Sequence, residues 1–126
     1  ITVHDGARPL VTPQVVQSVV KACAGASGAI PAIAVTDSLR RTLPGGDSVA
    51  VDRKEFRAVQ TPQAFQANKL RQAYTLPYTD SFTDDASVMT AAGFTDITLV
   101  DGDPRNIKIT LPCDIDIASL YLHSMQ

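Results

Sequence analysis

The residues of this chain that could do chemistry are cations, carboxylates and hydroxyls spread along its whole length. Asp5 and Arg8 stand three positions apart in the segment HDGARP, residues 4–9. In such a loop a carboxylate can meet a ribose hydroxyl or a metal ion, and a guanidinium can take a phosphate or a base carbonyl. Taken alone, the segment supports equally a local Asp–Arg pair that only fastens the loop.

Lys108 lies near the other end of the chain, in the segment GDPRNIKIT, residues 102–110. A strand over 106–110 would point its two isoleucines to the buried side, because strand side chains alternate. Asn106, Lys108 and Thr110 would then share the other side. On this stretch alone, Lys108 is a solvated lysine of an edge strand, which is the usual place for lysine, or a group that holds an anion.

Arg53, Thr61 and Thr83 complete the set of dispersed candidates. Each has an ordinary interpretation, as a solvated charge or a helix cap. A protein that moves a phosphorylated group needs such a set, because phosphoryl chemistry depends mainly on positioning and charge neutralisation. Spacing in the sequence does not establish that these side chains converge.

Other kinds of chemistry are not indicated. His4 and Asp5 are neighbours at the end of a strand, where side chains point to opposite faces, so we expect His4 to be structural. The sequence has no Gly-x-Ser-x-Gly motif, metal-spaced histidine set or Walker loop. Cys23 and Cys113 match no metal spacing and are expected to be reduced core thiols, which suits a cytoplasmic protein.

The composition limits the class of protein. With 126 residues, 44% hydrophobic and 19% charged, the chain is expected to form one globular domain. The formal net charge of -2 provides no basic field for nucleic acid, so any anion site must be local. No apolar run approaches the length of about 20 residues that crosses a bilayer. Because Ile1 and Val3 begin the chain inside a strand pattern, we expect a piece of a longer protein.

Helices and strands alternate along the chain, which predicts an α/β domain with a mostly parallel sheet. Two Thr-Pro pairs, Thr12-Pro13 and Thr61-Pro62, are typical of a helix cap followed by proline at the first helical position. In chain order we expect a strand at 1–4, a helix from Thr12 to Gly25, a strand at 29–35, a hairpin arm at about 36–57, a helix from Thr61, a helix at 83–93 capped by Thr83, strands at 96–100 and 106–110, and a closing helix at 112–123 with Ile115, Ala118 and Leu122 on one face.

Five segments in order carry a family resemblance: VHDGARP (3–9), VTDSLRR (35–41), VDRKEFRAVQTPQAF (51–65), TDDAS (83–87) and GDPRNIKIT (102–110). Together they resemble the successive motifs of the 2-C-methyl-D-erythritol 4-phosphate cytidylyltransferases, CTP-using enzymes of the non-mevalonate isoprenoid pathway. The C-terminal PCDIDIASLYL also resembles the closing helix of that family. The resemblance implies a Rossmann-like nucleotidyltransferase fold, of which residues 1–126 are the C-terminal part of a single domain with a dimerisation arm at about 36–57.

The activity that the resemblance implies is transfer of a cytidylyl group from CTP to 2-C-methyl-D-erythritol 4-phosphate, with release of pyrophosphate. It also implies a magnesium ion that binds the triphosphate, a homodimer and a cytoplasmic location, with neither nucleic acid nor membrane as partner.

The loop of residues 5–8 is implied to meet both substrates. Asp5 and Arg8 match residues that bind the nucleotide and the sugar phosphate, and Asp5, Gly6 and Ala7 match the part that approaches the nucleotide. Gly6 departs from the alanine common in the family, and its backbone contacts can survive because glycine is more permissive.

Two catalytic residues are implied. Lys108 matches the lysine that positions the substrate phosphate, and Arg53 matches an arginine that the arm brings to the partner subunit's site for the same purpose. Ser38, Thr61 and Thr83 match positions with a hydroxyl at the substrate, although many members have threonine in place of Ser38.

The family's N-terminal half, with its Gly-rich triphosphate loop, an arginine and a lysine, has no counterpart here, so we expect the 126 residues alone to be inactive. Two alternatives remain: a cytidylyltransferase for another polyol phosphate such as ribitol phosphate, and a non-catalytic dimerisation or binding module.

Overall fold

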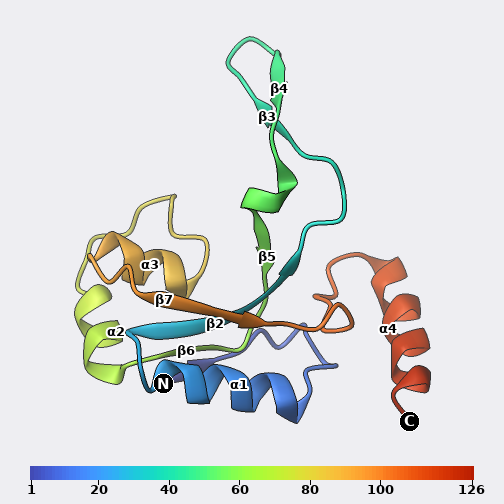
Figure 1. Cartoon of the computed structure of the whole chain (residues 1–126), viewed down its shortest axis with the longest axis horizontal. Helices are drawn as coiled ribbons and strands as arrows, with labels where there is room; N and C mark the ends of the chain where they lie inside the picture. The colour runs from blue at the N-terminus through green and yellow to red at the C-terminus, as the bar shows by residue number, and fades with distance from the viewer.

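A five-stranded sheet forms the centre of the computed structural model, which describes all 126 residues (Figure 1). Its hub is β2 (Gly28–Ala34), which has β7 (Ile97–Asp101) along one edge. Along its other edge lie β6 (Gln63–Phe65) at its beginning and β5 (Arg57–Val59) at its end. The two-residue strand β1 (Thr2–Val3) extends the sheet beyond β6.

The α/β class is confirmed, but the expectation of a mostly parallel sheet is wrong for these residues. Only β2 and β7 form a parallel pair, with Gly28 opposite Ile97 and Ala32 opposite Asp101. The chain returns from the arm directly along β2, so β5 and β6 run against it. Because β1 and β2 are both antiparallel to β6, β1 runs in the same direction as β2 and β7.

Helices cover both faces of the sheet (Figure 1). α1 (Pro13–Cys23) packs on one face, and α2 (Ala67–Ala73) and α3 (Asp85–Ala91) pack on the other. Neighbouring residues of β2, Ala29 and Ile30, belong to the two different clusters because strand side chains alternate between faces. The first cluster consists of Val15, Val19, Cys23, Ala29 and Ala64, and the second of Ile30, Phe65, Leu70, Ala73, Ala86, Val88 and Met89.

The helix starts follow local capping signals only in part. Thr12 caps α1 as predicted, and its hydroxyl accepts a hydrogen bond from the backbone of Val15. Thr61-Pro62, which has a cis peptide bond, starts no helix, because the next three residues form the buried strand β6. The cap of α3 is Asp84 and not Thr83, since the Asp84 carboxylate accepts from the Ser87 backbone N–H at 2.8 Å.

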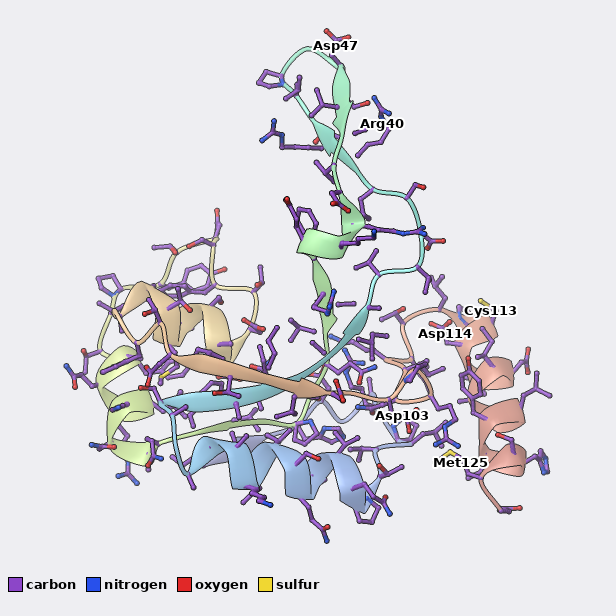
Figure 2. The ribbon with its side chains drawn as sticks, in the orientation of Figure 1. Arg40, Asp47, Asp103, Cys113, Asp114 and Met125 are labelled. Atoms are coloured by element: carbon purple, nitrogen blue, oxygen red, sulfur yellow. The ribbon has the colours of Figure 1, made fainter.

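The predicted arm is present as a hairpin of β3 (Arg40–Thr42) and β4 (Ser48–Ala50), followed by the short 3-10 helix Arg53–Glu55. Its turn contains Gly45 and Gly46, both with positive φ. The arm projects away from the sheet, and Figure 2 labels Arg40 and Asp47 on it, far from Asp103 beside the sheet.

The C-terminal region differs from the prediction in two ways. No strand forms over 106–110, and α4 (Pro112–Ser124) stands beside the sheet with Ala118 as its only buried residue. Cys113 is exposed in the first turn of α4 (Figure 2), so the expectation of a core thiol is wrong there but is confirmed for Cys23. Every helix of the protein is too short or too polar to span a membrane.

Candidate functional site

A pocket of about 350 Å³ opens beside the end of β1, between β5, β6 and the start of α3. It brings together five residues that the sequence had singled out at widely separated positions: Asp5, Arg8, Thr61, Thr83 and Lys108. The rest of its wall is formed by Val3, Val59, Gln60, Gln63, Asp84 and Asp85. The pocket is therefore polar, with cations at one side and carboxylates at another.

The cationic side is organised around a single carboxylate oxygen. Arg8 Nε donates to Asp5 Oδ2 at 3.2 Å, and Lys108 Nζ lies 3.8 Å from the same oxygen. The Arg8 side chain is 12% exposed and that of Lys108 50%, so the arginine is fixed while the lysine reaches toward solvent. Two cations share one carboxylate, which leaves a local positive charge able to attract an anion.

Thr61 lines the pocket, but its hydroxyl is used to hold the loop that carries Asp5 and Arg8. Thr61 Oγ1 accepts from the Asp5 backbone N–H at 3.0 Å and lies 2.9 Å from His4 Nδ1. The other ring nitrogen, Nε2, lies 3.0 Å from the carbonyl oxygen of Arg8, which can only accept. In the neutral ring Nε2 therefore carries the proton and Nδ1 accepts from Thr61. His4 is structural, as expected.

The opposite side of the pocket carries Thr83, Asp84 and Asp85 at the start of α3. The Thr83 hydroxyl makes no hydrogen bond within the protein, because Asp84 has taken the capping position. Tyr74 donates to the Asp85 carboxylate, and this hydrogen bond, together with desolvation and the negative charge, raises the pKa of Tyr74 to about 12. Thr83 is therefore free to bond a ligand.

Gln63, which the sequence analysis missed, fixes this wall to the sheet. Its side chain is buried, donates to Asp84 Oδ2 at 3.0 Å and accepts from the Ala86 backbone N–H at 3.2 Å. A glutamine inside a buried strand is unusual, and this polarity among apolar neighbours was the available signal. Gln63 acts by holding the first turn of α3, and with it Thr83, in place.

Two further buried amides, those of Gln60 and Asn106, were also missed. Asn106 was expected beside Lys108 on the wet side of a strand, but it is 0% exposed. The expectation was wrong because the segment is not a strand, so its side chains need not alternate. Asp103, in the preceding turn, pairs with Arg105 at 3.1 Å, and this pairing holds the pKa of the Asp103 carboxyl below its usual value.

Ser38 and Arg53 do not join the pocket within one chain. Both lie on the arm beside a separate hollow of about 450 Å³, and Arg53 donates to the carbonyl oxygen of Thr36 at 2.6 Å. Gly6 and Ala7 do not line the pocket either. A Cβ at Gly6 would meet nothing within 4 Å, so the departure from alanine changes no packing.

No three His, Cys, Asp or Glu side chains gather into a metal-binding cluster. Asp5 uses only Oδ2 for Arg8 and Lys108, which leaves Oδ1 without a protein partner. Magnesium in nucleotide sites is commonly held by one or two carboxylates together with substrate phosphates. The residues therefore fit a metal ion that arrives with a polyphosphate, and not one held by the protein alone.

Comparison with known proteins identifies relatives over almost the whole chain. The model of the 2-C-methyl-D-erythritol 4-phosphate cytidylyltransferase family matches residues 1–124. The chain is 42% identical over 123 residues to the enzyme of that name from Phocaeicola vulgatus, covering 97% of this chain and 55% of that protein. It is 43% identical over 125 residues to the one from Rubrobacter xylanophilus, covering 95% and 53%.

The fold is similar to solved structures with the same description. The crystal structure of 2-C-methyl-D-erythritol 4-phosphate cytidylyltransferase from Thermus thermophilus superposes with a TM-score of 0.81 at 34% identity, over 95% of this chain and 60% of that one. The chain spans about half the length of the curated relatives it matches.

Proposed function

The chain belongs to the 2-C-methyl-D-erythritol 4-phosphate cytidylyltransferase family, and we propose that the full-length protein carrying it transfers a cytidylyl group from CTP to 2-C-methyl-D-erythritol 4-phosphate. The products are pyrophosphate and 4-diphosphocytidyl-2-C-methyl-D-erythritol, a precursor of isoprenoids. The observation that carries the proposal is the convergence of Asp5, Arg8, Thr83 and Lys108, distant in sequence, on one polar pocket.

In the proposed reaction a phosphate oxygen of the polyol phosphate forms a bond to the α-phosphorus of CTP. The bond from that phosphorus to the bridging oxygen of the β-phosphate breaks, and pyrophosphate leaves with the electron pair. Both reactants are anions, so their repulsion opposes the approach. Lys108 and Arg8 reduce it by holding the acceptor phosphate, and of the two Lys108 has the more exposed side chain.

The polyol part of the acceptor would lie across the pocket from the two cations. Thr83 offers a free hydroxyl there, and the Asp84 and Asp85 carboxylates can accept from substrate hydroxyls. A volume of about 350 Å³ suits a ligand of this size, at the lower end of small-molecule sites.

A second copy of the protein would complete the site in this proposal. Ser38 and Arg53 lie on an arm that projects from the sheet and have no part in the pocket of their own chain. In a homodimer the arm would bring the Arg53 guanidinium to the partner's acceptor phosphate, beside Lys108. The homodimer and the shared site belong to the same proposal.

Asp5 would be the carboxylate that holds a magnesium ion bound to the triphosphate, with Gly6 and Ala7 in the adjoining loop. The contribution of the ion, when bound, is to neutralise charge on the triphosphate. The 126 residues alone set only two cations against three carboxylates in the pocket, so we expect them to be inactive without further cationic groups for CTP. CTP use and two free thiols suit the cytoplasm.

The test is a coupled pyrophosphate-release assay on the full-length protein with CTP and a panel of polyol phosphates. We expect turnover with 2-C-methyl-D-erythritol 4-phosphate to exceed that with ribitol 5-phosphate and other polyol phosphates. Faster turnover with ribitol 5-phosphate would reassign the acceptor. No pyrophosphate with any acceptor would leave the non-catalytic dimerisation module as the better account.

A further inference from the structure

The segment that brings Lys108 to the pocket is not held by the sheet. After β7 the chain makes isolated backbone bonds, from Gly102 N–H to Ala32 and from Ile109 N–H to Ala7, with no ladder between them. A lysine on such a segment would be poorly fixed unless other contacts positioned it.

One of these contacts is the buried carboxamide of Gln60. The side chain is 4% exposed and bonds both backbone groups of Asp103: Nε2 donates to its carbonyl oxygen at 2.8 Å, and Oε1 accepts from its N–H at 3.1 Å. Gly102 makes room for this approach, because a Cβ there would lie 2.5 Å from Gln60 Oε1. The side chain thus replaces the missing neighbour strand.

The second contact is the side chain of Asn106, which is fully buried. Its Nδ2 donates to the carbonyl oxygen of Thr61 at 2.9 Å, and its own backbone carbonyl oxygen accepts from Arg8 Nη1 at 2.8 Å. Asn106 is thus bonded both to Thr61, just before β6, and to Arg8, and Lys108 follows it two positions later. Asn106 sets the spacing between the two cations.

We infer that Gln60 and Asn106, together called the amide clamp, are positioning residues that hold Lys108 and Arg8 at the spacing needed to bind the acceptor phosphate. The inference rests on the proposed function, whose substrate it concerns. Their side chains are engaged within the protein: Gln60 lines the pocket with Nε2 and Oε1 both bonded to Asp103, and Asn106 does not line the pocket.

Stability and positioning can be separated at Asn106. Its Oδ1 is buried and has no hydrogen-bond partner, which is unfavourable for folding. Asn106→Leu removes the unpaired oxygen, which favours folding, and also the bond to Thr61, which opposes folding. The two effects on the free energy of unfolding therefore partly cancel. A side chain serving only to fill space would need no polar atoms here.

The experiment compares Asn106→Leu and Gln60→Met in the full-length protein with Asn68→Leu and Gln72→Met. The two control sites are exposed, and their side chains make no hydrogen bond. We expect both clamp variants to raise the KM for the acceptor phosphate by roughly 10- to 100-fold, as a misplacement of about 1 Å can do. The KM for CTP should stay the same, as should both constants in the controls.

A double-mutant cycle with Lys108→Ala tests whether the clamp acts through Lys108. If it does, Asn106→Leu causes little further loss in the Lys108→Ala background, whereas an independent structural role gives additive losses. Additive losses, or an unchanged acceptor KM in both clamp variants with the unmutated protein active, would overturn the inference.

Failure of the proposed function gives a different result, namely no turnover by the unmutated protein. Hydrogen exchange then tests, without an activity measurement, whether the amide clamp holds the segment that carries Lys108. Asn106→Leu must accelerate exchange at the Ile109 amide, which now bonds Ala7, and unchanged exchange would overturn the clamp without reference to activity.

Discussion

Removal of the Lys108 ammonium should separate substrate binding from folding. In the free protein this group lies 3.8 Å from Asp5 Oδ2, and its side chain is 50% exposed. An exposed pair of this kind contributes about 0–1 kcal/mol to the free energy of unfolding. Asp5 keeps its bond to the Arg8 guanidinium when Lys108 is lost. We therefore expect Lys108→Ala to fold with nearly unchanged stability.

The effect on the reaction should be much larger, because in the proposed function Lys108 bonds the acceptor phosphate more strongly than it pairs with Asp5, 3.8 Å away. A hydrogen bond to a charged group contributes about 1.5–3 kcal/mol, and about 1.4 kcal/mol corresponds to a factor of ten. Lys108→Ala should thus lower kcat/KM for the acceptor by about 10- to 150-fold. The KM for CTP should change little.

Steady-state pyrophosphate release by the full-length protein, with the acceptor varied at saturating CTP, measures this loss. Lys21→Ala is the matched control, since Lys21 is an exposed lysine in the last turn of α1, away from the pocket. An acceptor kcat/KM near that of the unmutated protein, with intact folding by thermal denaturation, would refute the assignment of Lys108 to the phosphate. A parallel loss for CTP would relocate Lys108 to the nucleotide.

Three further perturbations test other parts of the site. Mixing Arg53→Ala with Lys108→Ala protein under conditions of subunit exchange should restore part of the activity through hybrid sites, and no recovery after proven exchange contradicts a shared site. Asp103→Asn should lower the Tm at neutral pH. Because the pKa of Asp103 is lower in the folded protein, its carboxylate stabilises the fold above the unfolded pKa of 3.8, and this stabilisation is lost as the pH falls through the folded pKa. The Tm difference between variant and unmutated protein should therefore shrink in acid. Tyr74 should ionise near pH 12 because its phenol bonds Asp85, and an ultraviolet titration phase near pH 12 should disappear in Tyr74→Phe; survival of that phase in the variant contradicts the assignment.

Local chemistry was sufficient to predict those elements whose signals no distant contact opposes. The cap at Thr12 and the hairpin around Gly45 and Gly46 formed as expected, since each depends on residues only a few positions apart. The cap of α3 moved by one residue to Asp84. Both Thr83 and Asp84 can cap, and the bond from the buried Gln63 to the Asp84 carboxylate favours Asp84.

The pocket itself could be anticipated only through the family resemblance, because its members come from four separate segments. The resemblance supplied Asp5, Arg8, Thr61, Thr83 and Lys108 but not Gln60 and Asn106, whose side chains bond the residues around Lys108. Gln60 and Asn106 have no local pattern that predicts burial, since polar residues are usually exposed. Their role depends on partners more than 40 positions away, which hydrogen bonds of the folded chain alone disclose.

The two Thr-Pro pairs make the physical reason plain. Thr12-Pro13 and Thr61-Pro62 carry the same local signal, yet only the first begins a helix. After the second, residues 63–65 are buried by pairing with β1 and β2, which outweighs a cap contributing about 1 kcal/mol. The Thr12 hydroxyl caps its own helix by accepting the Val15 backbone N–H, whereas the Thr61 hydroxyl caps no helix and accepts the backbone N–H of Asp5. The failure of the local signal at Thr61 is therefore what gives the Asp5 loop its anchor: had a helix started there, the loop would have lost the hydroxyl that accepts the Asp5 backbone N–H.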